Sequence, residues 1–362
     1  MLFYPYDYYK DFTGEANMRK TVFTLLVIIV MLSTSSCSRA LQKHQGSFLF
    51  LFNTITEIVA YTKNEDEFTK LANFIKEDLE IYHQLYDKYN SYEGINNIKT
   101  INDNAGKEPI KVDKKIIDLL KYSKDAYELT NGRVNIGMGS VLEIWHDYRT
   151  QGIDDPLNAT LPPMELLVEA NKHTNLDMLI IDEISATVLI ADSNMSLDVG
   201  AIAKGYATEQ VTKAAIVKGY TDFLLSVGGN VRAAGGKGKE KAPWNVGIQN
   251  PDKESEQHSL FTLALKDLSL VASGDYERYY TVDGKMYHHI IDPYTLMPSE
   301  YFTAVSVICE DSGLADLLST AIYNMPYDEG LALIESLEDT EALWILHDGS
   351  MKYSDGFEAL LR

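Results

Sequence analysis

The stretch SLDVGAIAKGYATEQV, from Ser196 to Val211, sets one carboxylate, two glycines and one lysine among small alanines. Its first half is typical of a turn and its second half of a helix, so we expect Lys204 in the first turn of that helix. Free backbone N–H groups at a helix start attract anions, and a lysine there adds a full positive charge. The stretch therefore predicts a compact anion site, although a solvated lysine in an ordinary Gly-Ala turn would give the same pattern.

The charge of the chain restricts its partners. Of 362 residues, 32 are Lys or Arg and 53 are Asp or Glu, which gives a formal net charge of -21. Because no basic surplus exists to neutralise phosphates, nucleic acid and anionic membrane surfaces are excluded as electrostatic partners. A phosphate ligand must then be held locally, by backbone amides, one or two cations or a metal. The hydrophobic fraction of 45% is that of a folded globular protein.

The N-terminal region carries the pattern of an export signal. Arg19 and Lys20 precede the apolar run TVFTLLVIIVML, and the small residues STSS lead to Cys37. The apolar run is shorter than the roughly 20 residues that a membrane-spanning helix needs. We predict a bacterial lipoprotein anchored by lipidated Cys37 to the extracytoplasmic face of the membrane. The alternative is an ordinary signal peptide with an incidental cysteine. Residues 1–17 lack a basic n-region, so we expect translation to start at Met18.

This pattern divides the chain into an upstream extension and signal over residues 1–37, a tether over 38–47 and one domain over 48–362. If Cys37 is lipidated, Cys309 has no disulfide partner. Cys309 ends the apolar run AVSVIC, so we expect a buried structural thiol rather than a nucleophile.

The periodicity of apolar residues predicts an α+β protein. Helical spacing covers residues 65–89, 113–132, 162–173, the second half of 196–219, and 311–325. Strand patterns cover 47–62, a hairpin over 176–192, and most of 223–309. No linker or repeat divides the chain. We expect a single unit in which helices pack on a mainly antiparallel sheet.

Three further segments carry weak chemical signals on their own. The glycines of SVGGNVRAAG suit a turn with unusual dihedral angles. His288 and His289 are adjacent, so only one of them can face a given site. In ADLLSTA the oxygens of Asp316, Ser319 and Thr320 fall on one helical face, and hard oxygens of this kind suit Mg²⁺ shared with a nucleotide. Each pattern is more often structural when it occurs alone.

Taken in order, the segments resemble a known family. SLDVGAIAKGYA, SVGGNVRAAG, SGDYERYYTVDGKMYHHIIDPYTLMP and ADLLSTA resemble the motifs of the ApbE family, the FAD:protein FMN transferases, and the resemblance runs from about Tyr82 to the C-terminus. It implies transfer of the FMN half of FAD to a threonine hydroxyl of an acceptor flavoprotein, with release of AMP. It also implies Mg²⁺ as cofactor and FAD as substrate. A lipoprotein signal is usual in that family.

The resemblance also implies roles for individual residues. Mg²⁺ would be held by Asp316, Thr320 and the carbonyl of Ala201, assisted by Ser319. His289 would be the base that deprotonates the acceptor threonine. FAD would be contacted by Lys204, whose charge partner would then come from the substrate, by Asp198, and by three residues of the loop NIGMGSVLEIW, namely Met138, Gly139 and Ser140.

One position departs from the family pattern. The family usually has a glycine where this chain has Leu296, so if the dihedral angles of that glycine are needed, the loop must be rebuilt. Two other functions fit parts of the pattern. An FAD-binding lipoprotein or an FAD pyrophosphatase would share the site without transferring FMN to a protein. An extracytoplasmic solute-binding or adhesion protein would have no such site and would leave Asp316 and Thr320 as surface residues.

Overall fold

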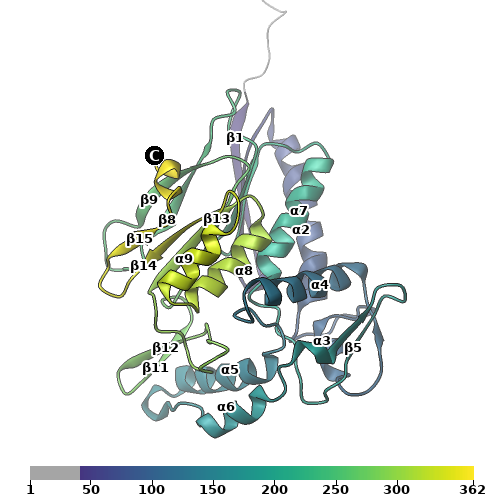
Figure 1. Cartoon of the computed structure of the whole chain (residues 1–362). Helices are drawn as coiled ribbons and strands as arrows, with labels where there is room; N and C mark the ends of the chain where they lie inside the picture. Colours follow the sequence, from purple (N-terminus) through teal and green to yellow (C-terminus); the bar gives the residue numbers. More distant parts are fainter. Residues whose placement is uncertain (1–40) are drawn as a thin grey trace, which may run out of the picture. The chain divides into compact units, whose positions relative to one another are not determined.

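An eight-stranded antiparallel sheet runs through residues 41–362, the part of the chain that the computed structural model describes (Figure 1). All seven neighbouring pairs in this sheet are antiparallel. Its spatial order is β1 (Gln42–Leu49), β2 (Ile55–Thr62), β6 (Phe223–Val227), β7 (Asn230–Ala234), β10 (Ser269–Gly274), β13 (Ala304–Cys309), β14 (Glu341–Ile345) and β15 (Met351–Tyr353).

The sheet is covered on both faces, and the central strand β13 shows this directly. All of its residues are buried, and they alternate between two hydrophobic cores, because side chains on a strand point to opposite faces. Val305 and Val307 belong to the larger core, which includes α2 (Glu65–Tyr86), α4 (Lys114–Leu129), α7 (Ala203–Val217) and α8 (Ser312–Tyr323). Ala304 and Ile308 belong to the core under the hairpin of β8 (Trp244–Gln249) and β9 (Ser259–Leu265). The helix α9 (Tyr327–Glu335) follows α8.

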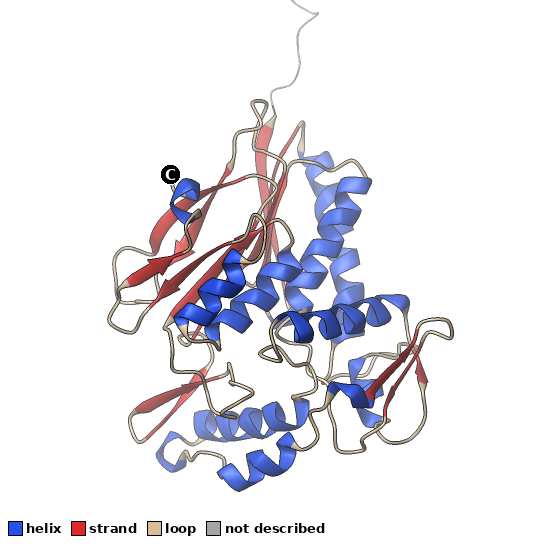
Figure 2. Ribbon diagram, in the orientation of Figure 1, coloured by secondary structure: helices blue, strands red, loops and turns tan. Residues whose placement is uncertain are grey.

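A third, smaller core lies between the helices drawn at the bottom of Figure 2 and the two-stranded hairpin above them. It joins α5 (Gly139–Asp154) to the hairpin of β11 (Tyr279–Val282) and β12 (Lys285–His288), and α6 (Met164–Asn171) packs beside α5. A separate three-stranded sheet contains β3 (Ile110–Lys111), β5 (Thr187–Ile190) and β4 (Leu179–Asp182), with α3 (Ile98–Asp103) nearby.

The α+β class and the antiparallel sheet are confirmed, as are five predicted helices. α2, α4, α6, α7 and α8 lie within the ranges predicted from periodicity. Asp311 caps α8, because its side chain accepts hydrogen bonds from the N–H groups of Gly313 and Leu314. The hairpin over 176–192 is confirmed as β4 and β5. Cys309 is 2% exposed and burial raises its pKa to about 12, as expected of a structural thiol.

Other expectations about the fold are wrong. The strand predicted over 47–62 is a hairpin, with a tight turn at Leu51–Asn53 between β1 and β2. Because β1 begins at Gln42, most of the predicted tether over 38–47 is part of the sheet. The segment treated as a loop around Met138 begins α5. The sequence patterns also missed α3, α9, β14 and β15.

The predicted signal peptide, the start at Met18 and the lipidated Cys37 all lie outside the described residues. Within residues 41–362, no helix is both long enough and apolar enough to span a membrane.

Leu296 occupies its loop without the rebuilding that the sequence suggested. Its φ is 61°, the left-handed conformation in which glycine carries no penalty and other residues do. Its side chain is 5% exposed in the third core, and its carbonyl accepts a hydrogen bond of 2.9 Å from Nε1 of Trp145. The burial of the leucine side chain therefore compensates for the strained backbone.

Leu296→Gly tests this balance. The substitution relieves about 1–2 kcal/mol of backbone strain but removes a buried side chain worth about 2–5 kcal/mol. We expect the free energy of unfolding in urea to fall by roughly 1–3 kcal/mol. Leu157→Gly, which removes a side chain that is 97% exposed, is the control and should change stability much less. A Leu296→Gly protein more stable than wild type would mean that strain dominates.

Candidate active site

The turn before α7 is built by short polar contacts. The carboxylate of Asp198 accepts a hydrogen bond of 2.8 Å from the N–H of Gly200. The backbone N–H of Asp198 donates to the carbonyl of Ile136, also at 2.8 Å. The N-cap residue Ile202 makes no side-chain hydrogen bond, and the N–H of Ala203, the first residue of α7, donates to the carbonyl of Val199 at 2.8 Å. Lys204 is the second residue of α7, as the sequence predicted, and Ala201 lies in the turn just before it.

The first turn of α7 packs directly against α8. A Cβ at Gly205 would lie 2.3 Å from Cβ of Asp316 and 2.4 Å from the carbonyl of Ser312, so only glycine fits there. This contact lets the N–H of Gly205 donate to Oδ2 of Asp316 at 2.8 Å. Thr320 lies one turn further along α8 and is partly exposed. The Asp316 and Thr320 oxygens therefore share one helical face beside the start of α7.

A buried ion pair between β7 and α7 stabilises the contact between α7 and α8. Arg232 on β7 donates from Nε to Oε2 of Glu209 on α7 at 3.0 Å, and both side chains are almost fully buried. The same Oε2 atom accepts from the N–H of Ser312, at 3.0 Å, in the first turn of α8. One carboxylate therefore connects the sheet and both helices.

Lys204 has a carboxylate partner within the folded protein. The expectation that its charge partner comes only from the substrate is therefore wrong. The Nζ atom of Lys204 lies 3.6 Å from Oδ1 of Asp316 and donates to Oδ1 of Asn230 at 3.3 Å. Asn230 follows Gly228 and Gly229, whose φ values of 56° and 90° form the turn that the sequence predicted. Asn230 is 2% exposed and its Nδ2 atom has no partner.

Asp198 forms an ion pair that sequence reasoning missed. Its Oδ2 atom lies 2.7 Å from Nζ of Lys88, and both side chains are largely buried. Burial alone would lower the pKa of Lys88, but the charge of Asp198 and its hydrogen bond outweigh this and raise it. Lys88 sits in a loop held by the carboxylate of Asp87, which accepts from the N–H groups of Tyr89 and Asn90. No sequence pattern marks Lys88, because its partner is distant in the chain.

Met138, Gly139 and Ser140 lie beside the same turn. The N–H of Gly139 donates to the carbonyl of Ser196 at 2.9 Å, and a Cβ at Gly139 would lie 2.3 Å from that oxygen. The hydroxyl of Ser140 donates to the carbonyl of Asn194 at 2.7 Å. Met138 is 4% exposed in the third core. The structure thus brings the start of α5 against the turn that carries Asp198.

Ser319 is placed differently from the other predicted ligands. It is fully buried, and its hydroxyl lies 2.8 Å from the hydroxyl of Ser273 on β10 and 2.9 Å from the carbonyl of Asp316. These contacts fix α8 against the sheet. They leave Ser319 poorly placed to assist a metal.

The two adjacent histidines have separate surroundings, as predicted. His288 is buried, with Nε2 2.7 Å from the carbonyl of Ser299 and Nδ1 accepting from the N–H of Ile290 at 3.2 Å. Both of its nitrogens are therefore used inside the protein. His289 has a buried Nδ1 atom without a hydrogen-bond partner. Burial, followed by the charges of Arg278 and Arg149, lowers the pKa of His289 to about 3, so its imidazole is neutral at pH 7.

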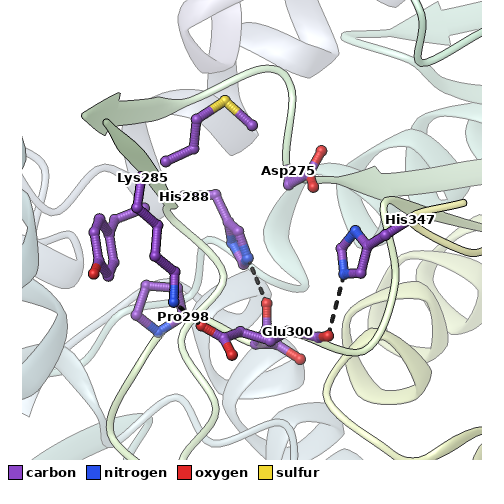
Figure 3. Close-up of a pocket in the computed structure, with 9 residues that line it drawn as sticks. Asp275, Lys285, His288, Pro298, Glu300 and His347 are labelled. Atoms are coloured by element: carbon purple, nitrogen blue, oxygen red, sulfur yellow. Dashed lines mark hydrogen bonds and ion pairs between the residues drawn. The ribbon is translucent and has the colours of Figure 1, made fainter. Parts of the chain in front are cut away.

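His288 also borders a pocket that is separate from the predicted site. Figure 3 shows His288 and His347 pointing into a pocket of about 330 Å³, and no residue predicted to bind FAD or metal lines it. Its labelled walls come from Asp275, Lys285, Pro298 and Glu300.

The structure groups the predicted residues around the start of α7. Lys204 and Asp316 are in contact, with Ala201 and Thr320 on the adjoining turns. Asp198 and Met138–Ser140 form the neighbouring part of the site. Among the described residues no cluster of three or more His, Cys, Asp or Glu side chains could hold a metal ion. A metal here would depend on one carboxylate, a hydroxyl and a carbonyl.

The fold and the site define an α+β protein in which a lysine at the start of a helix, beside a buried carboxylate, suits a phosphate-bearing ligand. The model of the ApbE family matches residues 52–344, and the chain belongs to this family.

Relatives and solved structures agree with this assignment. The chain is 30% identical to the FAD:protein FMN transferase of Treponema pallidum, over 72% of this chain and 73% of that protein. It is 28% identical to the enzyme of the same name from Klebsiella pneumoniae, over 72% and 80%. The crystal structure of the ApbE protein from Thermotoga maritima is similar with a TM-score of 0.77 and 29% identity, covering 89% of this chain and 100% of that one.

The low pKa of His289 predicts acid-sensitive stability. Between about pH 3 and its ordinary value of 6.5, the unfolded chain binds a proton at this position and the folded chain does not. The free energy of unfolding should therefore fall as the pH is lowered from 7 to 4. In His289→Gln this fall should be shallower, by up to about 1.4 kcal/mol per pH unit.

Urea unfolding at several pH values checks this prediction. His258→Gln, which replaces an exposed histidine, is the control and should keep the wild-type slope. Equal slopes for wild type and His289→Gln would show that His289 titrates normally in the folded protein.

Proposed function

We propose that the protein is an FAD:protein FMN transferase, which cleaves FAD, transfers its FMN half to a threonine hydroxyl of an acceptor flavoprotein and releases AMP. The observation that carries the proposal is the contact between Lys204 and Asp316 at the start of α7, beside a neutral histidine. The names of the relatives support the same activity.

The donor atoms at this site fit Mg²⁺. Asp316 supplies a carboxylate that is 4% exposed, Thr320 a hydroxyl and Ala201 a backbone carbonyl, all hard oxygens. A site with so few protein ligands suits an ion that keeps waters and binds substrate phosphates. When bound, Mg²⁺ would neutralise negative charge on the pyrophosphate. Lys204, 3.6 Å from Asp316, would add a second positive charge to the same place.

His289 supplies the base for the transfer. Its neutral imidazole accepts the proton of the acceptor hydroxyl while that oxygen attacks the phosphorus of the FMN half. A new P–O bond to the acceptor forms, the bond to the bridging oxygen breaks, and AMP leaves with that oxygen. His288 fixes the backbone next to His289, because its Nδ1 accepts from the N–H of Ile290 and its Nε2 lies 2.7 Å from the carbonyl of Ser299. The hairpin thereby fixes the direction of the His289 side chain.

We also propose that the protein is a lipoprotein attached through Cys37 to the extracytoplasmic face of a bacterial membrane. The support is the basic, apolar and small-residue order before Cys37. The first strand begins at Gln42, so only a short segment would separate the lipid from the domain.

A transfer assay tests the activity. The full chain is incubated with FAD, Mg²⁺ and a threonine-bearing flavin-acceptor domain, and covalent flavin fluorescence on the acceptor is measured in a denaturing gel together with AMP. We expect a fluorescent band that depends on Mg²⁺. Asp316→Ala should reduce its rate on the order of 100-fold or more. Asp355→Ala, which removes an exposed carboxylate, is the control. AMP without a band would identify a pyrophosphatase instead.

The base is tested by His289→Ala in the same assay. Losing a general base should slow transfer by about 10²–10⁴-fold. FAD affinity should stay near the wild-type value, because the imidazole acts on the acceptor hydroxyl. Loss of FAD binding in this variant would assign His289 to the substrate site and not to proton transfer.

A further inference from the structure

Two arginines that the proposed mechanism does not use lie near enough to His289 for their charges to act on it. The first, Arg278, is placed by the register of the β11–β12 hairpin. Tyr279 pairs with His288, and Tyr280 pairs with Tyr287. Arg278 and His289 are therefore the next two residues beyond the last pair of this hairpin, one preceding β11 and one following β12. The Arg278 side chain is exposed.

The second arginine, Arg149, reaches the hairpin from α5. His146, Arg149 and Gly152 follow at three-residue intervals and so lie along one face of the helix. A Cβ at Gly152 would meet the ring of Tyr280 at 2.4 Å, so this face packs directly on β11. Arg149 is half-buried, and its guanidinium lies 3.0 Å from Nδ1 of His146. The ring of His146 in turn packs against that of Tyr89, with centroids 5.8 Å apart.

Neither guanidinium is neutralised by the protein. Among the described residues, no carboxylate oxygen lies within 4.0 Å of the nitrogens of Arg149 or Arg278. The buried Arg232 and the largely buried Arg133 behave differently, because they pair with Glu209 at 3.0 Å and with Asp292 at 3.2 Å. Arg149 is half-buried and has no carboxylate partner, although the chain carries a formal net charge of -21. Burial lowers the pKa of Arg149, and the charge of Arg278 acts in the same direction.

We propose that Arg149 and Arg278 form an anion site that holds a phosphate group of the nucleotide beside His289. The inference rests on the proposed function and extends it to two residues on α5 and the hairpin. A planar guanidinium binds phosphate oxygens through two parallel hydrogen bonds, and two such groups suit a phosphate that carries more than one negative charge. A purely structural arginine would be expected to pair with a carboxylate, as Arg232 does.

The anion site also affects the base. Burial is the largest cause of the low pKa of His289, and the charged or titratable groups that act on it, Arg278, Arg149, His288 and Lys204, all lower the pKa further. A phosphate bound between the arginines offsets their charge, so the pKa of His289 rises from about 3 toward its ordinary value when the ligand binds. A base with a pKa nearer to neutral accepts a proton more readily. Binding of the nucleotide thereby prepares His289 for its role.

Binding measurements test the proposal independently of transfer. Equilibrium dissociation constants of the full chain for FAD, FMN and AMP are measured for wild type, Arg149→Gln, Arg278→Gln and the double variant. We expect each single variant to bind FAD about tenfold more weakly, since a charge-assisted hydrogen bond is lost. The dissociation constants for FMN and AMP show which phosphate the arginines bind, because only the ligand that carries this phosphate binds more weakly to the variants. Arg362→Gln, which removes an exposed arginine at the C-terminus, is the control.

Arg149→Lys and a thermal unfolding curve for each variant separate lost contacts from lost folding. The lysine variant should retain more FAD affinity than Arg149→Gln. A double variant that is folded and binds FAD within threefold of wild type overturns the proposal.

The histidine provides a second readout. The pKa of His289, followed by NMR of labelled histidine, should rise in the wild-type protein on binding of whichever of FMN and AMP loses affinity in the arginine variants. It should be higher in the free double variant than in the free wild type. An unchanged pKa in the free double variant would also contradict the inference. Failure of wild type to flavinylate any acceptor would refute the proposed function without altering these binding results.

Discussion

The hydrogen bond from the N–H of Gly205 to Asp316 is the contact on which the site depends. It forms only because position 205 has no Cβ, which would otherwise lie 2.3 Å from Asp316. Loss of this contact would separate α7 from α8, and with them Lys204 from Asp316. The buried carboxylate of Glu209 fixes the same two helices to the sheet through Arg232 and Ser312. Breaking one partner of such a pair leaves an uncompensated charge in the core and is strongly destabilising.

Positively charged side chains are concentrated in one part of this acidic protein. The surface is acidic overall, while Lys88, Lys204, Arg149 and Arg278 gather around α5, α7 and the β11–β12 hairpin. Two of these cations have a carboxylate partner and two have none. Because a low-dielectric environment strengthens such fields, a few positive side chains can attract an anion to an otherwise repulsive protein. Burial is the largest cause of the low pKa of His289, and the charges of these arginines and of Lys204 lower it further.

The sequence predicted the parts of the fold that depend on local patterns. The helices with clear apolar periodicity and the two-glycine turn before Asn230 are both present in the structure. Segments whose burial depends on distant packing are missed, as with α5, whose start the sequence analysis treats as a loop. At the site, Lys88 and Arg149 carry no motif, since only the folded chain brings them near Asp198 and His289. The left-handed conformation of Leu296 could not be read from its residue type, because tertiary packing imposes it.

The two edge strands of the eight-stranded sheet determine whether a strand from another molecule can pair with it. An edge strand offers unpaired N–H and C=O groups that can recruit a strand from another chain and begin aggregation. Here one edge, β15, is only Met351–Tyr353 and places Lys352 at its centre. The other edge, β1, is mostly polar and carries Lys43 and a glycine at position 46. The short length and the lysine of β15, and the lysine and glycine of β1, all disfavour the addition of a strand from a neighbouring copy.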